Sequence, residues 1–105
     1  MSVVQSSEIN NMKYYDRNGK EIDFTTWGRL LGDIKYKIVK QDTLKNGKFV
    51  STVWLGLDHG IGLKPEIFET MVFPSKGNWG DELCERYATL KEAEAGHKKI
   101  INLTK

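Results

Sequence analysis

Apolar residues recur at the spacing of a helix in two segments of the chain. The first segment follows Asp23, a residue suited to the N-cap, and carries Phe24, Trp27, Leu30 and Leu31. The second segment carries Leu90, Ala93, His97, Ile100 and Ile101. It opens with Thr89-Leu90-Lys91-Glu92, the sequence pattern of a capping box. We therefore predict a short helix after Asp23 and a longer helix over residues 90–101, each with one apolar face packed inward.

Between these helices the apolar positions alternate, which is typical of strands. From Ile34 to Ile38 apolar and lysine side chains alternate, which predicts a strand with one buried face near a sheet edge. Residues 49–57 and 67–73 carry apolar side chains on both faces, so we expect two central strands. Residues 82–87 predict a further, more polar strand.

Two Asn-Gly pairs predict tight hairpin turns. Asn18-Gly19 lies between Tyr14-Tyr15 and residues 20–22, and Asn46-Gly47 lies between the first two sheet strands. Each pair suits the two positive-φ positions of a type I′ turn. The first pair therefore predicts a small hairpin before the first helix.

The order of elements is hairpin, helix, strands and helix, with short connections throughout. It predicts an α+β fold, a four- to five-stranded antiparallel sheet with two helices packed on one face. Residues 1–11 are polar and aperiodic and are predicted to be a flexible N-terminal extension. Residues 12–105 then form a single α+β domain.

The composition of the 105-residue chain fits one small domain and excludes several classes of protein. At 39% hydrophobic and 29% charged residues, it can fill one modest core and cover it with a solvated surface. No apolar run approaches the roughly 18 residues of a membrane span, and residues 1–11 lack the pattern of a signal peptide. The single cysteine, Cys84, cannot form an internal disulfide, which is typical of a reducing cytosol. We expect a cytoplasmic protein.

The charge distribution gives little support for nucleic-acid binding. The formal charge is +2, from 16 basic and 14 acidic side chains, which falls short of the basic stripe that such proteins usually carry. The densest basic stretch contains Lys35, Lys37 and Lys40. We interpret it as a solvated strand face or a lysine-protected sheet edge. Nucleic-acid binding through these lysines and exposed aromatic side chains remains an alternative.

Asp58 and His59 follow a predicted central strand and lie beside glycines, so they are candidates for a metal ligand or a general base. The structural interpretation is a turn in which the Asp58 carboxylate accepts hydrogen bonds from nearby amides. Two adjacent residues cannot complete a metal site, and the other histidine, His97, lies far along the chain.

Glu69 is a further candidate because it is an acid within an apolar strand. A carboxylate there must be paired, protonated or turned toward solvent, since burying its charge alone costs several kcal/mol. Arg86 and His97 are its plausible partners. The choice is between a structural ion pair and a binding groove.

His97 and Trp79 complete the candidates. His97 lies on the apolar stripe of the last helix, which favours a core histidine bonded to the sheet over a catalytic one. Its neighbour Gly96 indicates a close approach to a strand or loop, because glycine weakens a helix interior. Trp79 lies in a loop and is either an interface anchor or a side chain folded onto its own domain.

Four segments together resemble a family of short, uncharacterised bacteriophage and prophage proteins. The matching segments are YYDRNG with Trp27, VSTVWLGLDH, IFETMVF, and RYAT followed by Glu92-Ala93 and Gly96-His97. The resemblance spans nearly all of residues 12–97, and the segment STVWLGLDH carries most of its specificity. It implies an accessory gene expressed in a bacterial cytoplasm, and it carries no catalytic or binding residue over to this chain.

These observations lead to a hypothesis and two alternatives. No phosphate loop, hydrolase elbow or His-Glu-x-x-His motif is present, so we expect a non-enzymatic protein without cofactor or metal. It would bind a host or phage protein, for example as an inhibitor of a bacterial defence system. The first alternative is a metal- or small-molecule-binding protein or hydrolase that uses Asp58, His59, Glu69 and His97. The second is a nucleic-acid-binding module.

Overall fold

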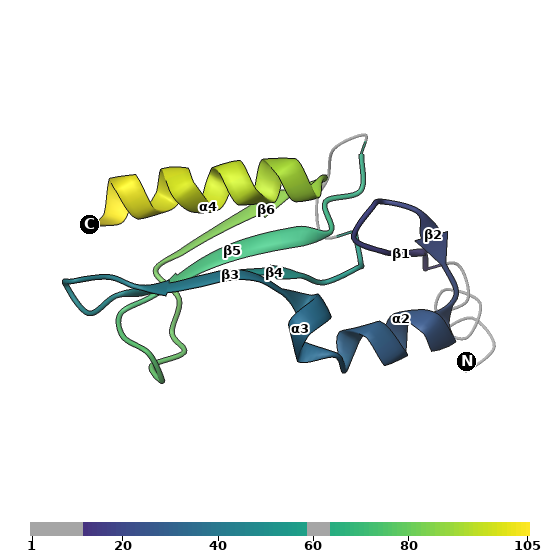
Figure 1. The fold of residues 1–105 in the computed structure, drawn as a ribbon, viewed down its shortest axis with the longest axis horizontal. Helices are drawn as coiled ribbons and strands as arrows, with labels where there is room; N and C mark the ends of the chain where they lie inside the picture. The colour runs from purple at the N-terminus through teal and green to yellow at the C-terminus, as the bar shows by residue number, and fades with distance from the viewer. Residues whose placement is uncertain (1–11, 59–63) are drawn as a thin grey trace, which may run out of the picture.

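The computed structural model describes residues 12–58 and 64–105. The predicted extension and His59 therefore lie outside the described residues. A four-stranded antiparallel sheet has the order β3-β4-β5-β6, and a separate two-stranded hairpin pairs β1 with β2 (Figure 1). The strands are β1 (Tyr14–Tyr15), β2 (Glu21–Ile22), β3 (Ile38–Thr43), β4 (Phe49–Trp54), β5 (Phe68–Phe73) and β6 (Leu83–Tyr87). The helices are α2 (Phe24–Leu31), α3 (Ile34–Lys37) and α4 (Leu90–Thr104).

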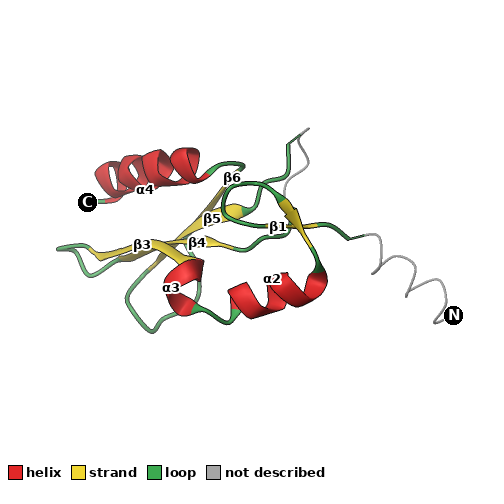
Figure 2. Ribbon diagram, turned by 45° about the vertical axis from the view of Figure 1, so that its right-hand side comes forward, coloured by secondary structure: helices red, strands yellow, loops and turns green. Residues whose placement is uncertain are grey.

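The predicted α+β class, with an antiparallel sheet and packed helices, is confirmed. Helix α4 lies along the sheet and contacts all four strands. Helices α2 and α3 gather with the β1–β2 hairpin at the end of the sheet where β4 stops (Figures 1 and 2). There the Trp27 indole N–H donates to the carbonyl of Leu55 at 2.9 Å, and the Tyr36 ring meets the Trp54 ring edge-on. The first helix is thus anchored through Trp27.

Local sequence signals account for both predicted helix starts. The Asp23 carboxylate accepts from the amide of Thr26 at 2.7 Å, which caps α2. This bond also lowers the pKa of Asp23. At α4 the Thr89 hydroxyl accepts from the amide of Glu92 at 3.1 Å, and the Glu92 carboxylate accepts from the Thr89 amide at 3.2 Å. The predicted capping box is therefore confirmed.

The predicted strand from Ile34 to Ile38 is wrong in its first four residues. Residues 34–37 form the helical turn α3, and β3 begins only at Ile38. Asp33 explains the difference, because its carboxylate accepts from the amide of Tyr36 and caps the turn. Lys35 and Lys37 consequently lie on α3, and only Lys40 of the three predicted lysines lies on the strand.

The two Asn-Gly turns occur where predicted but have a different geometry. In each Asn-Gly pair only the glycine, Gly19 or Gly47, has positive φ, and the asparagine does not. In the second hairpin the Gly47 amide donates to the carbonyl of Leu44, and the Leu44 amide donates to the carbonyl of Lys48. This is the pattern of a type I turn followed by a left-handed glycine, not of a type I′ turn.

The core between the sheet and α4 has two apolar clusters with a polar band between them. Trp54, Ile67, Phe68 and Ala93 form the larger cluster. Val50, Val72 and Ile100 form the smaller one. The cross-strand pair Thr52–Thr70 lies between the pairs Val50–Val72 and Trp54–Phe68, and both threonines are fully buried. Buried hydroxyls need hydrogen-bond partners, and the partner comes from α4.

In the part of the chain that the structure describes, no helix is both long enough and apolar enough to cross a bilayer.

Candidate functional site

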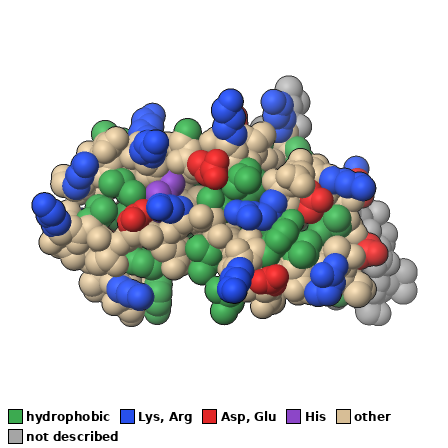
Figure 3. Space-filling model, viewed as in Figure 1, with side chains coloured by type: hydrophobic (Ala, Val, Ile, Leu, Met, Phe, Trp, Pro, Cys, Tyr) green, Lys and Arg blue, Asp and Glu red, His purple; other side chains and the backbone are tan. Residues whose placement is uncertain are grey.

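A groove of about 890 Å³ lies between the β3 edge of the sheet and α4. Val39, Lys40 and Asp42 line it from the strand. From the helix it is lined by Glu94, Ala95, His97, Lys98, Lys99, Ile101, Asn102 and Leu103. The space-filling view shows hydrophobic side chains on this face of the molecule with basic side chains around them (Figure 3). We call this region the β3–α4 groove.

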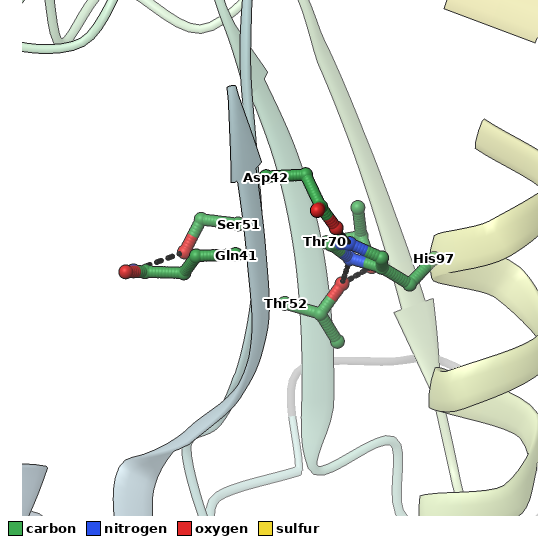
Figure 4. Close-up of polar contacts among 6 residues, drawn as sticks. All are labelled: Gln41, Asp42, Ser51, Thr52, Thr70 and His97. Atoms are coloured by element: carbon green, nitrogen blue, oxygen red, sulfur yellow. Dashed lines mark hydrogen bonds and ion pairs between the residues drawn. The ribbon is translucent and has the colours of Figure 1, made fainter. Parts of the chain in front are cut away.

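A chain of hydrogen bonds forms the floor of the β3–α4 groove (Figure 4). Nε2 of His97 lies 2.8 Å from a carboxylate oxygen of Asp42. Nδ1 of the same ring lies 2.6 Å from the hydroxyl of Thr52, which in turn bonds the hydroxyl of Thr70. With the carboxylate accepting from Nε2–H, a neutral ring accepts the Thr52 proton at Nδ1. The single imidazole thereby bonds a partly exposed carboxylate on β3 and a buried hydroxyl on β4.

This arrangement has the composition of a catalytic acid–histidine–hydroxyl set but not the accessibility. Thr52 and Thr70 are fully buried, and the ring of His97 is nearly so. Only Asp42, whose side chain is 35% exposed, reaches solvent. A hydroxyl nucleophile must reach the substrate, and neither threonine does. The network instead fixes α4 to the sheet, as the interpretation of His97 as a core histidine anticipated.

The rim of the groove carries lysines without charged partners. Lys40, Lys98 and Lys99 line the groove, and none of them forms an ion pair with another described residue. Two carboxylates face them. That of Asp42 is held by His97, which leaves Glu94 as the one carboxylate in the lining without an ion-pair partner among described residues. The groove thus joins an apolar interior to a rim that favours anionic groups.

Glu69 lies on the opposite face of the sheet from the groove. Its carboxylate accepts from Nε of Arg86 at 3.2 Å, so the structure provides one of the two partners considered for it. It cannot pair with His97, because Glu69 and Thr70 are adjacent in β5 and point to opposite faces. Figure 4 shows the same alternation in β3, where Gln41 bonds Ser51 on one side and Asp42 bonds His97 on the other.

Cys84 lies beside this ion pair and donates its thiol hydrogen to the Glu69 carboxylate at 3.1 Å. Partial burial, then the hydrogen bond to Glu69 and the negative charge of that carboxylate, raise the pKa of Cys84 to about 11. The thiol is therefore protonated at neutral pH and is a poor nucleophile. The three side chains form a structural cross-strand cluster between β5 and β6.

The remaining predicted residues do not join one site. The Asp58 carboxylate accepts from the amide of Glu66 at 3.0 Å, which fits the structural interpretation of that turn. Glu69 and His97 lie on opposite faces, so the set proposed for a hydrolase does not converge as far as the structure describes it. Within residues 12–58 and 64–105, no group of three or more metal-ligating side chains is present.

Trp79 packs on its own domain, which is one of the two interpretations considered for it, while its role as an interface anchor stays a prediction. Its ring meets those of Phe49 and Phe73 edge-on, with centroids 6.3 and 5.1 Å away, so it packs on its own domain. It nevertheless remains 63% exposed. These rings lie on the face opposite α4, since Phe49 and Phe73 alternate with the groove-side residues Val50 and Val72.

Sequence reasoning missed Asp42 and the groove itself. The available signal was His97, a histidine on an apolar stripe that needs a polar partner on the sheet. Which residue supplies that partner depends on the register of β3, and β3 carries a bulge between Ile38 and Lys40.

Comparisons with protein-family models, with curated proteins and with solved structures found no match to this chain.

Proposed function

We propose that this chain is a small non-enzymatic protein that acts by binding a protein partner in the β3–α4 groove. The observation that carries the proposal is the groove itself, which is open and about 890 Å³ in volume. An apolar depression with a few polar groups is the usual form of a binding site. Its floor is held by the network of His97, Asp42 and Thr52, so the walls are positioned before a partner arrives.

The polar groups of the groove support binding rather than catalysis. The only chain of acid, imidazole and hydroxyl among the described residues ends at buried threonines. The other polar side chains that line the groove are Lys40, Lys98, Lys99, Glu94 and Asn102. They suit charge recognition and steering of a partner more than proton transfer.

The resemblance to short phage and prophage proteins supports a setting for this binding. We propose an accessory protein of a bacteriophage or prophage that acts in the bacterial cytoplasm on a host or phage protein. Inhibition of a bacterial defence protein is the action to examine first. The bound partner would then be a component of such a system, blocked by occupancy alone.

The experiment compares three immobilised proteins as baits in one bacterial host lysate: the wild type, Lys98→Glu and Lys91→Glu. Both variants reverse one exposed charge on α4, but only Lys98 lines the groove. We expect a stoichiometric protein partner with the wild type and Lys91→Glu, and about tenfold less with Lys98→Glu. Recovery of no partner, or equal recovery with all three baits, would count against the proposal.

A further inference from the structure

Strand β3 is an edge of the sheet, so part of its backbone is unpaired within the described chain. The amide of Leu44 donates to Lys48, which makes these two residues a hydrogen-bonded pair of the hairpin. Such pairs alternate with non-bonded ones along an antiparallel ladder. Lys40 and Asp42 therefore direct their amides and carbonyls toward β4. Gln41 and Thr43 direct theirs to the free edge.

The free edge borders the β3–α4 groove. The side chains of Lys40 and Asp42 point to the side of the sheet that α4 covers, and both line the groove. A strand added next to β3 would place the residues opposite them on that same side. Alternate side chains of the added strand would then enter the groove, while its backbone paired with Gln41 and Thr43.

From this geometry we infer that the partner contributes an extended peptide segment, which adds to β3 as a fifth strand of the sheet. The inference rests on the proposed function, because it specifies how the partner occupies the same groove. Main-chain bonds supply affinity in this mode of recognition, and side-chain pockets supply specificity. The groove-facing residues of the segment are apolar where they meet Ile101 and Ala95, and acidic where they meet lysine.

Charge selects this occupant over a basic or neutral one. The ammonium groups of Lys40 and Lys98 line the groove from opposite walls, and neither has an ion-pair partner among described residues. A carboxylate on the added strand opposite Lys40 gains a cross-strand charge pair. A lysine at that position would place like charges against each other.

The same features restrict what can pair with the edge. The bulge between Ile38 and Lys40 interrupts the ladder, so the regular stretch available for pairing runs only from Lys40 to Thr43. Lysines and bulges protect edge strands from indiscriminate pairing. Here they leave a short edge that accepts an acidic strand.

Two substitutions at Thr43 distinguish a partner that pairs its backbone with β3 from a partner that only fills the groove. Thr43→Pro removes the outward amide and leaves the bonds to β4, because Thr43 does not donate to that strand. Thr43→Val keeps the amide and is the matched control. The side chain of Thr43 is exposed, so neither change disturbs the core. Circular dichroism and the thermal midpoint verify that both variants fold.

The probes are three capped synthetic decapeptides. In the first peptide every second residue is threonine, and the residues between the threonines alternate between valine and glutamate. The second replaces each glutamate by lysine. The third has the sequence of the first, but the backbone amides that would donate hydrogen bonds to β3 are N-methylated. Titration into ¹⁵N-labelled protein, followed by amide chemical shifts, measures binding and locates it.

We expect the first peptide to shift the amides of β3 and of the groove face of α4. Binding should weaken about tenfold for the lysine peptide, for the N-methylated peptide and for Thr43→Pro, and should persist for Thr43→Val. Equal affinity for the methylated and unmethylated peptides, no binding of any peptide, or shifts confined to β6 would overturn the inference. So would a dimer that forms through β3 and is abolished by Thr43→Pro.

The lysate comparison separates failure of this inference from failure of the proposed function. A partner that is lost with Lys98→Glu but retained equally by Thr43→Pro and Thr43→Val occupies the groove without adding a strand. That result refutes the inference and leaves the proposed function standing. A partner retained by Lys98→Glu contradicts both.

Discussion

The imidazole of His97 on α4 meets the carboxylate of Asp42 on the edge strand β3 at 2.8 Å, across 55 positions of the sequence. The same ring bonds Thr52 on the neighbouring strand. One side chain therefore ties the helix to two strands and sets the distance between the walls of the β3–α4 groove. Both the stability of the domain and the shape of the β3–α4 groove therefore depend on the contact between His97 and Asp42.

His97→Ala should lower the free energy of unfolding by about 2–4 kcal/mol, because it leaves the buried hydroxyl of Thr52 without its imidazole partner and removes a buried side chain. Asp42→Asn should cost only about 1 kcal/mol, since the amide oxygen still accepts from Nε2–H at a partly exposed site. Urea denaturation measures both values. A loss below about 0.5 kcal/mol for His97→Ala would contradict the structural role of the network.

Two glycine substitutions in helices should have opposite effects on stability. A Cβ at Gly96 would lie 2.3 Å from the ring of Tyr87, so Gly96→Ala should destabilise the domain by about 1–3 kcal/mol despite the better helix propensity of alanine. At Gly28 in α2 a Cβ would meet no heavy atom within 4 Å apart from its own stretch of helix, and Gly28→Ala should stabilise by up to about 1 kcal/mol. Thermal melts of the two variants check the contrast. Melting temperatures that move in the same direction would refute the packing of Tyr87 on Gly96.

Trp54→Ala should destabilise the domain by about 3–5 kcal/mol, since this side chain is fully buried at the centre of the larger apolar cluster. The change also removes the indole N–H that donates to the Tyr15 carbonyl at 3.0 Å, and so loosens the β1–β2 hairpin. Urea denaturation gives the magnitude. An unchanged melting temperature with lost binding would place Trp54 on a functional surface instead.

The Cys84 thiol should react slowly with iodoacetamide in the folded protein. Its pKa is raised from 9.0 to about 11, and the thiolate fraction falls tenfold for each unit of pKa above the pH. At pH 8 the folded chain should therefore react roughly ten- to a hundredfold more slowly than the urea-unfolded chain. Glu69→Gln removes the neighbouring charge, lowers the pKa and should speed the reaction several-fold. Equal rates for folded and unfolded protein would contradict this environment.

Features that depend on neighbouring residues were predictable from the sequence. The capping box of Thr89 and Glu92 forms within one helical turn, so the local sequence alone determines its two hydrogen bonds. The central strands were predictable because apolar residues on both faces indicate burial on both sides. Glu69 and Arg86 are cross-strand neighbours in β5 and β6, and the need of an acid within an apolar strand for a partner pointed to the pair.

Features that depend on strand register or on competing local signals were not predictable from the sequence. Alternation over residues 34–37 fits a strand, but the carboxylate of Asp33 caps a helical turn there, and a four-residue window does not decide between them. Asp42 meets His97 only because its register opposite Val50 turns its side chain toward α4. A shift of one residue would turn Asp42 to the other face and remove the floor of the groove.

The central claim is that a protein partner occupies the β3–α4 groove, and lysine footprinting of the purified complex tests it most directly. Acetylation by a soluble reagent, followed by mass spectrometry, compares each lysine in the free and bound protein. We predict protection of Lys40 and Lys98, with unchanged reactivity at Lys91 on α4 and at Lys76 beside the Phe49 ring on the opposite face. Protection of Lys76 with Lys40 and Lys98 still reactive, or the absence of any stable complex, would contradict the account.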